Sequence, residues 1–363
     1  MKILYGVQAT GQGHISRARA MAAAFARHPQ VEVQWLFSGR PRDKLFDMQP
    51  FGDYLHRRGL TFATDSGRIR YRATVTGNNP AQFLRDVREL DLARYDLVVT
   101  DFEPVCAWAA RRHGVRSIGI GHQYAFGAHT PVRGGNALGR FIMRHFAPVD
   151  LALGLHWAPY GGTVLPPILD LPDLPLREAG HILVYLPFED QEAVTRLLGE
   201  IPGQEFVQYA SGLRHETRGN VTRHPANTQT FKRHLASSVG VICNSGFELV
   251  SECLHWRKPV LTKPLNGQME QLSNALALEQ LGYATTCDEL TCRDIRRWLA
   301  DPLRPPACGF PDVAAALARW LASGCREAPA ILARELWPRL DQGHAGRRPE
   351  AGRHASAQGA LAA

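Results

Sequence analysis

Short apolar segments alternate with helical ones along the first half of the chain. Residues 2–7 are apolar enough for a buried strand, and residues 15–27 have the three- and four-residue spacing of a helix. Residues 31–37 are the next predicted strand. A strand, a loop, a helix and a strand in this order predict the beginning of a parallel sheet with crossover helices. The pattern continues with strands at residues 96–100, 116–120 and 151–155.

A segment dense in proline and glycine interrupts this alternation at residues 159–175, which is typical of a linker between domains. We therefore predict an α/β protein with two Rossmann-like lobes facing a cleft, and a ligand site at the carboxyl ends of the strands. The expected parts are a first lobe at 1–158, a linker at 159–179, a second lobe at 180–340 and a disordered tail at 341–363. The second lobe has predicted strands at 181–186, 205–209, 239–243 and 259–262 and predicted helices at 191–200 and 248–255.

Amino-acid composition restricts the possible binding partners less than the order of predicted strands and helices restricts the fold. The 363 residues carry a formal net charge of +8, which favours anionic partners. No helix-turn-helix, zinc-finger or RNA-binding aromatic signature accompanies the charge, so no nucleic acid is expected. The seven cysteines form no CxxC pair and no metal-ligand spacing, which favours a reducing compartment and no metal site. Neither a secretory nor a membrane-spanning segment is visible, and a cytoplasmic location is expected.

The most informative segment lies at residues 241–274, where an apolar strand ends in the small polar turn Asn244-Ser245-Gly246. The turn opens a helix, and the unpaired backbone N–H groups at a helix start favour a phosphate. Gly246 lets a ligand approach the backbone closely, and Ser245 can cap the helix or donate to an oxygen. Glu252, farther along the same helix, can accept hydrogen bonds from a vicinal diol such as a ribose.

The loop after the next strand adds polar groups that suit sugar hydroxyls. It begins at Lys263-Pro264, and its polar side chains are Gln268, Glu270, Gln271 and Asn274. The ordered series from the small-residue turn to this loop resembles the nucleotide-sugar glycosyltransferases of the GT-B fold. These include the UDP-glycosyltransferases, the peptidoglycan GlcNAc transferase, and archaeal and bacterial members of unassigned function.

The resemblance implies a role for each matching residue. The residue matching Glu252 holds the nucleotide ribose, and the pair matching Glu270 and Gln271 contacts donor-sugar hydroxyls. The turn matching Ser245 and Gly246 meets the diphosphate. The donor-binding residues expected in this chain are Asn244, Ser245, Gly246, Phe247, Glu252, Gln268, Glu270 and Gln271.

Three positions of this segment depart from the family pattern. Asn244 stands where many plant enzymes have a phosphate-binding His. Glu248 and Leu249 stand where an Asn and a Ser or Thr are common. Because a carboxylate near a diphosphate is unfavourable, Glu248 is expected to point away from it or to bond a hydroxyl.

In the first lobe, the sequence Gly11-Gln12-Gly13-His14 follows the first strand, which predicts His14 at the strand-to-helix turn facing the crevice. Histidine is suited to removing a proton at neutral pH. In the GT-B families a Gly-His in this loop places the His near the acceptor hydroxyl, often as the general base. Arg17 stands where those families often have Pro. A histidine that only caps the helix is the alternative.

Two more strand ends bring candidates to the same crevice. Asp101 is expected to orient His14 or to act as the base itself, and capping of the next helix is the alternative. Glu103 completes the sequence Asp-Phe-Glu, which mimics the acidic metal motif of another glycosyltransferase fold. His122 and Gln123 are candidates for acceptor binding, with a satisfied loop histidine as the alternative. The acceptor and cleft residues expected are Gly11, Gly13, Arg17, Glu103, His122 and Gln123.

Residues 133–146 interleave Arg140, Arg144 and His145 with apolar side chains, which suits a surface helix on an anionic membrane. An ordinary amphipathic helix is the more frequent explanation for such a pattern.

The residues and the resemblance together predict a glycosyltransferase that moves a sugar from a UDP-sugar to an acceptor hydroxyl, with inversion and without a metal. The first lobe is expected to bind the acceptor and the second lobe the nucleotide-sugar donor, which is a co-substrate; no cofactor is expected. The sequence does not identify the acceptor. A lipid-linked or cell-envelope glycan is one candidate, and it would bring the enzyme into peripheral contact with the inner face of the membrane. A UDP-sugar 2-epimerase of the same fold and a non-catalytic nucleotide-binding sensor are the alternative functions.

Overall fold

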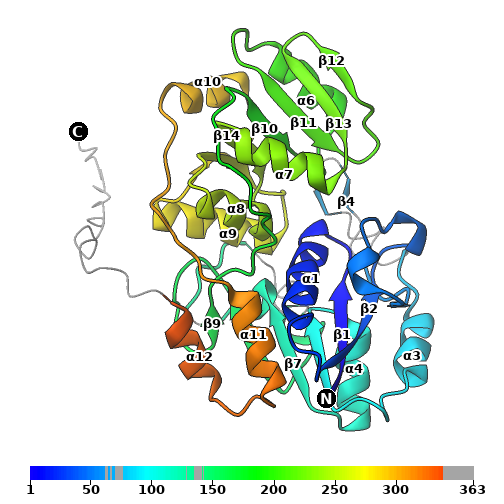
Figure 1. Ribbon diagram of the computed structural model, residues 1–363. Coiled ribbons are helices and arrows are strands. Elements are labelled where there is room, and N and C mark those ends of the chain that lie inside the picture. The colour runs from blue at the N-terminus through cyan, green and yellow to red at the C-terminus, as the bar shows by residue number, and fades with distance from the viewer. Residues whose placement is uncertain are drawn as a thin grey trace, which may run out of the picture.

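The computed structural model describes residues 1–61, 77–127, 129–134, 141 and 143–337, together with the backbone of residues 64–65 and 68–69. The described residues form two lobes, each built on a seven-stranded, largely parallel sheet with helices packed against it. Figure 1 shows the first lobe in blue and cyan and the second lobe above it, mostly in green and yellow. The predicted fold class is confirmed.

The first sheet has the strand order β3-β2-β1-β6-β7-β8-β9, so the chain proceeds outward from β1 in both directions. The carboxyl ends of β1 and β6 therefore flank a topological switch point, which is where open α/β sheets bind ligands. The strands are β1 (Lys2–Gln8), β2 (Glu32–Ser38), β3 (Leu55–His56), β6 (Leu97–Asp101), β7 (Ser117–Gly121), β8 (Leu151–Leu155) and β9 (Val164–Leu165). The helices of this part of the chain are α1 (Gln12–Phe25), α3 (Pro80–Glu89) and α4 (Pro104–His113), with short turns η1 (Arg42–Lys44), η2 (Gln49–Phe51) and η3 (His122–Ala125). A separate antiparallel pair is formed by β4 (Thr64–Asp65) and β5 (Arg68–Ile69).

The second sheet has the order β12-β13-β11-β10-β14-β15-β16, in which only β12 is antiparallel to its neighbour among the described strands. Its switch point lies between β10 and β14, so the turn at Asn244 is at the equivalent place in this lobe. The strands are β10 (Ile182–Tyr185), β11 (Phe206–Ala210), β12 (Glu216–Arg218), β13 (Val221–Pro225), β14 (Gly240–Asn244), β15 (Val260–Lys263) and β16 (Thr285–Thr286). The helices are α6 (Gln191–Gly199), α7 (Thr228–Ser237), α8 (Phe247–His255), α9 (Met269–Leu281) and α10 (Cys292–Ala300).

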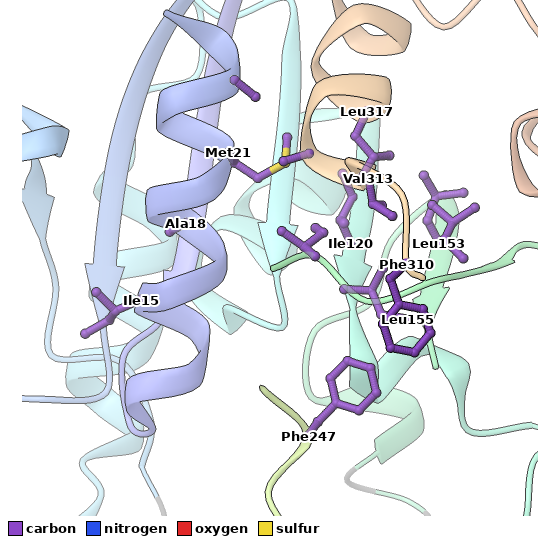
Figure 2. Close-up of a cluster of buried hydrophobic side chains, with 14 of the residues drawn as sticks. Ile15, Ala18, Met21, Ile120, Leu153, Leu155, Phe247, Phe310, Val313 and Leu317 are labelled. Atoms are coloured by element: carbon purple, nitrogen blue, oxygen red, sulfur yellow. The ribbon is translucent and has the colours of Figure 1, made fainter. Parts of the chain in front are cut away.

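The last two helices, α11 (Val313–Ala322) and α12 (Pro329–Leu336), return to the first lobe (Figure 1). Figure 2 shows Val313 and Leu317 of α11 beside Met21 of α1, in a buried cluster that also holds side chains of β7 and β8. Trp337, just after α12, donates its Nε1–H to Val164 O of β9 over 2.8 Å. Burial of the apolar face of α11 stabilises this arrangement, because each large apolar side chain contributes about 1.5–3 kcal/mol when it leaves water.

The predicted and observed boundaries differ at three places. The expected second lobe at 180–340 is too long, because α11 and α12 pack on the first lobe. The expected linker at 159–179 contains β9, which extends the first sheet. Helix α1 begins at Gln12 instead of residue 15 because Gly11 is its N-cap, so His14 lies in the first helical turn. The expected tail at 341–363 lies outside the described residues.

Candidate active site

A cavity of about 990 Å³ lies between the lobes, at the carboxyl ends of both sheets. Its walls come from the turn and first helix after β1 and from the turns and helices after β10, β13, β14 and β15. Residues predicted for the site that line it are Gly11, Gly13, His14, Gln123, Asn244, Gly246, Phe247, Glu252, Gln268, Glu270 and Gln271. The structure therefore brings the motifs of the two lobes together around one space.

His14 and Asp101 form a hydrogen-bonded pair on the first wall. The Nδ1 atom of His14 lies 2.9 Å from Oδ1 of Asp101, which is the last residue of β6. Because a carboxylate only accepts, this contact is satisfied by the tautomer that carries its hydrogen on Nδ1. That tautomer leaves the lone pair of Nε2 to take a proton. His14 lines the cavity, whereas the Asp101 side chain is 1% exposed and does not.

Arg17 holds Asp101 from the next turn of α1. Its Nε donates to Asp101 Oδ2 over 2.9 Å and its Nη2 to Oδ1 over 2.7 Å. Nη2 also lies 2.8 Å from Nδ1 of His14, but this contact is not a hydrogen bond in the tautomer that carries its hydrogen on Nδ1, because both nitrogens are then donors. Burial raises the pKa of the Asp101 carboxyl, but Arg17 and then His14 lower it, and the net pKa lies below its usual range. Asp101 is thus an ionised, buried partner that orients His14, and the N-cap of the following helix is Glu103 instead.

Arg17 also connects the two lobes. Its Nη1 forms an ion pair with Glu248 in the first turn of α8, and the Arg17 side chain is only 2% exposed. The Glu248 carboxylate lies so close to the backbone of Gly13 that a Cβ at this position would clash with Oε2 of Glu248. Two of the departures from the family pattern, Arg17 and Glu248, therefore pair with each other. Arg17 is a buried interlobe residue and not the cleft contact that was expected.

The second wall contains the start of α8. Gly246 is the N-cap of this helix, and among the described residues no side chain caps it. Gly246 and Phe247 line the cavity, so the first turn of α8, with its free N–H groups and the positive end of the helix dipole, borders it. The Ser245 side chain neither caps α8 nor reaches the cavity as expected, because it is fully buried and its hydroxyl lies 3.0 Å from Thr262 Oγ1.

Several buried polar atoms around the cavity have no protein partner within the described part of the chain. They include Gln12 Nε2, Gln123 Oε1, Asn244 Oδ1 and Gln268 Oε1. Buried polar groups in proteins are nearly always hydrogen-bonded, so these atoms are suited to a ligand rich in hydroxyl groups. Two further predicted donor residues accept a hydrogen bond from the protein: Gln123 Nε2 donates to Glu270 Oε2 over 3.1 Å, and Leu265 N donates to Gln271 Oε1 over 2.9 Å.

Glu252 lines the cavity and forms an ion pair with Lys232 of α7. Burial raises the pKa of the Glu252 carboxyl above its usual range, and the adjacent Lys232 opposes that shift. Lys232 also lines the cavity, and sequence reasoning missed it because α7 carries no recognisable motif. A single lysine in an amphipathic helix is common at protein surfaces, so the sequence gives no signal that would have identified Lys232 as a site residue.

Three further predicted residues have buried side chains. Glu103 is fully buried and accepts from Val105 N and Cys106 N at the start of α4, so it does not face the cleft. His122 is also fully buried: its ring nitrogens lie 2.8 Å from Leu155 O and 2.7 Å from Asn274 Oδ1, and burial lowers its pKa. Phe247 stacks on His122 with ring centroids 3.9 Å apart, so its ring packs in the core although the residue borders the cavity.

Within the described ranges, no helix combines the length and apolar character needed to cross a bilayer. The same residues contain no group of three or more His, Cys, Asp or Glu side chains arranged to hold a metal ion. Of the proposed membrane-facing segment, residues 135–140 and 142 lie outside the described residues, including Arg140. Metal independence and membrane contact stay predictions.

Two facing Rossmann-like lobes with a site between their switch points define an enzyme of the GT-B class. Three solved structures show this fold. The structure of S. aureus MnaA with UDP has a TM-score of 0.58 and 12% identity, and the match covers 89% of this chain and 96% of that one. The spinosyn forosaminyltransferase SpnP has a TM-score of 0.54 and 16% identity over 93% of this chain and 98% of that one. Acinetobacter baumannii MurG has a TM-score of 0.50 and 14% identity over 82% of this chain and 89% of that one. The profile of Glycosyl transferase family 1 matches residues 1–302, so the chain belongs to this family and is a glycosyltransferase. No functionally curated protein matches its sequence.

Proposed function

We propose that this glycosyltransferase moves a sugar from a UDP-sugar to an acceptor hydroxyl with inversion at the anomeric carbon. The observation that carries the proposal is the arrangement of the cavity, with the His14–Asp101 pair on one wall and the uncapped start of α8 on the other. Nε2 of His14 removes the proton of the acceptor hydroxyl as that oxygen attacks the anomeric carbon. The nucleoside diphosphate leaves from the opposite face, and its charge develops beside α8.

The donor is held by the second lobe. The N–H groups at the start of α8 meet the diphosphate, Glu252 accepts from the ribose hydroxyls, and Glu270 and Gln271 accept from the sugar. Lys232 pairs with Glu252 and opposes the rise that burial causes in the pKa of its carboxyl. Arg40 adds positive charge from the first lobe, because it lines the cavity and donates to the neutral oxygens Gln12 Oε1 and Thr10 O. The helix start and Arg40 neutralise the leaving diphosphate without a metal, and no resident cofactor takes part.

Glu248 does not oppose the diphosphate because its charge is neutralised by Arg17. The ion pair also joins the first turn of α1, which carries the base, to the first turn of α8, which meets the donor. Closure of the lobes around the substrates excludes water, which otherwise competes as acceptor.

The first test is thermal unfolding with UDP, TDP, GDP and ADP and with their sugar conjugates. A ligand at about one hundred times its dissociation constant adds about 2.7 kcal/mol to the free energy of unfolding. We expect UDP and a UDP-sugar to raise the midpoint, and Glu252→Gln to reduce the rise. Glu289→Gln is the matched control, since Glu289 is an exposed residue of the same lobe that does not line the cavity.

Product analysis tests the chemistry. The anomeric proton of the product, observed by NMR, is expected to report a configuration opposite to that of the donor, and turnover is expected to persist in EDTA. No midpoint rise with any nucleotide would remove the basis of the proposal. Conversion of the donor to an epimer in the absence of acceptor would replace it with the epimerase alternative.

A further inference from the structure

A second cavity, of about 350 Å³, lies at the end of α8 that is remote from the cleft. Two chain segments connect the lobes: an outgoing connection at residues 166–181, between β9 and β10, and a returning connection at residues 301–312, between α10 and α11. The cavity is lined by residues 176–178 of the first connection, by Arg304 of the second, and by residues 256–259 between α8 and β15. It therefore adjoins both connections, and among the described residues it shares no lining residue with the cleft.

The charge around this second cavity is mostly positive. Its cationic lining residues are Arg177, Arg257, Lys258 and Arg304, and Glu178 is the one carboxylate that the described residues contribute. Glu178 lies 3.6 Å from Arg304, but the two side chains are 62% and 63% exposed, so this ion pair contributes little. Within the described ranges, Arg177 and Arg257 form no ion pair. Positive charge without counter-ions in a concave surface attracts anions.

Lys258 is the buried member of this set. Only 6% of its surface is exposed, and its Nζ donates to Ala236 O over 2.9 Å and to Ser238 O over 2.6 Å at the end of α7. Both acceptors are neutral, and an ammonium group has a third N–H that is left for a ligand. Burial lowers the pKa of the Lys258 ammonium group, and the Glu178 carboxylate only partly opposes that shift. Because a buried cation without a charged partner is unfavourable, a bound anion would stabilise Lys258 in its charged form.

Arg257 has a backbone conformation that usually belongs to glycine. Its φ is +55°, and it ends α8 in a Schellman motif, in which Arg257 N donates to Leu254 O over 3.1 Å and Lys258 N donates to Cys253 O over 2.8 Å. The left-handed position of this motif is usually glycine, because a side chain there is strained. Strained residues cluster at ligand-binding sites, so Arg257 is a second indication of a ligand at this cavity.

We propose that the second cavity binds the phosphate group of a small anionic molecule, and that this anion joins both connections between the lobes to the end of α8. Arginine forks and a lysine ammonium are the side chains that recognise phosphate oxygens. Here they come from three separate segments of the chain, so one anion that contacts them all bridges those segments. The site is independent of the donor site, and it does not require the transfer reaction proposed above.

Hydrogen exchange measured by mass spectrometry tests the location, with inorganic pyrophosphate as the probe. Sodium chloride at equal ionic strength is the reference, because it reproduces general screening of charge. We expect pyrophosphate to slow exchange at residues 176–179, 256–258 and 301–304. Pyrophosphate in the donor site would slow exchange at residues 244–250, so one measurement distinguishes the two sites. Protection confined to residues 244–250 would overturn the inference while supporting the proposed function, and protection at the second cavity alone would support only the inference.

Arg257→Gly tests the residues. Glycine adopts a φ of +55° without strain, so this variant should unfold at the same midpoint as the parent protein or a higher one when no anion is present. We expect the dissociation constant of pyrophosphate, obtained from the concentration dependence of protection at residues 176–179, to rise about tenfold with the loss of one charge-assisted contact. Arg196→Gln is the matched control, because Arg196 is an exposed residue of α6 in the same lobe and lines neither cavity. Equal dissociation constants for the parent protein and Arg257→Gly would overturn the inference.

A second arm identifies the source of the phosphate group. The protein is sedimented with vesicles of phosphatidylcholine that contain phosphatidic acid, and with vesicles of phosphatidylcholine alone. Sedimentation that requires phosphatidic acid, and that Arg257→Gly weakens while Arg196→Gln does not, would assign the phosphate to a lipid headgroup. Protection by pyrophosphate without such sedimentation would assign it to a soluble molecule.

Discussion

The surroundings of Asp101 and the start of α8 lie on opposite walls of one cleft, and they differ in how far their polar groups are satisfied. Asp101 is contacted by His14 and bonded by Arg17 and is almost completely buried. The start of α8 has no side-chain cap, and the neighbouring Asn244 Oδ1 is buried without a partner in the described part of the chain. A region that is already bonded needs no rearrangement during reaction, whereas an unsatisfied region gains its partners from a ligand.

The difference indicates that the two walls have different roles in the reaction. The protein alone arranges the proton-accepting group, and the donor completes the hydrogen bonds of the opposite wall. Substitutions around Asp101 should therefore change turnover and stability, while those around α8 should change donor affinity.

The largest expected effect is that of His14→Ala. Turnover should fall by about 10²–10⁴, the usual contribution of a positioned general base, while the midpoint rise produced by the donor remains. Steady-state rates at saturating donor, combined with thermal unfolding, check both parts. His113→Ala, at the exposed end of α4, is the control. Full turnover in His14→Ala would assign the proton transfer elsewhere.

The next effect concerns the ion pairs of Arg17. Replacement by Met leaves Asp101 buried and Glu248 partly buried without their cation, which should lower the free energy of unfolding by about 3–5 kcal/mol. Urea denaturation provides the measurement. Adding Asp101→Asn and Glu248→Gln to Arg17→Met should recover part of the loss, since no uncompensated charge remains. A decrease of less than about 1 kcal/mol in the free energy of unfolding would mean that the ion pairs of Arg17 are exposed to solvent in solution.

Leu317→Ala tests the packing of α11 on the lobe that carries His14. Leu317 is fully buried, and its truncation should cost about 2–5 kcal/mol. Hydrogen exchange should show the lost protection mainly in α1, β7 and β8, and less in the second sheet. Leu303→Ala, at a position 40% exposed, should have little effect. Equal loss of protection in both lobes would contradict the assignment of α11 to the first.

The smallest effect is a pH dependence in the second lobe. Burial first, and then the nearby His224 and His181, lower the pKa of His234 to about 4, below the value of about 6.5 for an unfolded chain. The neutral form is therefore the one that stabilises the fold: its contribution is complete above pH 6.5 and is lost as the pH falls toward 4. His234→Gln should flatten the decline of the unfolding midpoint between these values by about a degree or two. An unchanged decline would exclude His234 as its source.

The strands and the lobes followed from short apolar segments, because a parallel strand buried on both faces is recognisable as a local apolar run. The strand ends at or near His14, Asp101 and Asn244 were predicted for the same reason. His14 and Asn244 line one cavity, and Asp101 contacts His14 from behind it. Which lobe an amphipathic helix covers is not a local property. The positions of α11 and α12 were consequently predicted wrongly.

Side-chain direction was the harder part of the site. Asp101 and Glu103 are two residues apart on either side of a strained Phe102, so one orients the base and the other caps a helix. His122 and Ser245 stand at strand ends, yet both side chains turn into the core. The Arg17–Glu248 and Lys232–Glu252 pairs join residues far apart in the sequence, and only the packed fold determines that they meet.

Because α11 and α12 complete the first lobe, the part of the chain that the structure describes starts and finishes in that lobe, and residues 182–300 are inserted within it. A growing chain on the ribosome has therefore made the whole second sheet before it has made the helices that cover α1. The inserted lobe can fold while the earlier one still exposes the apolar surface of Met21, Ile120 and Leu153. The first lobe is completed only when α11 and α12 have left the ribosomal tunnel and pack against it.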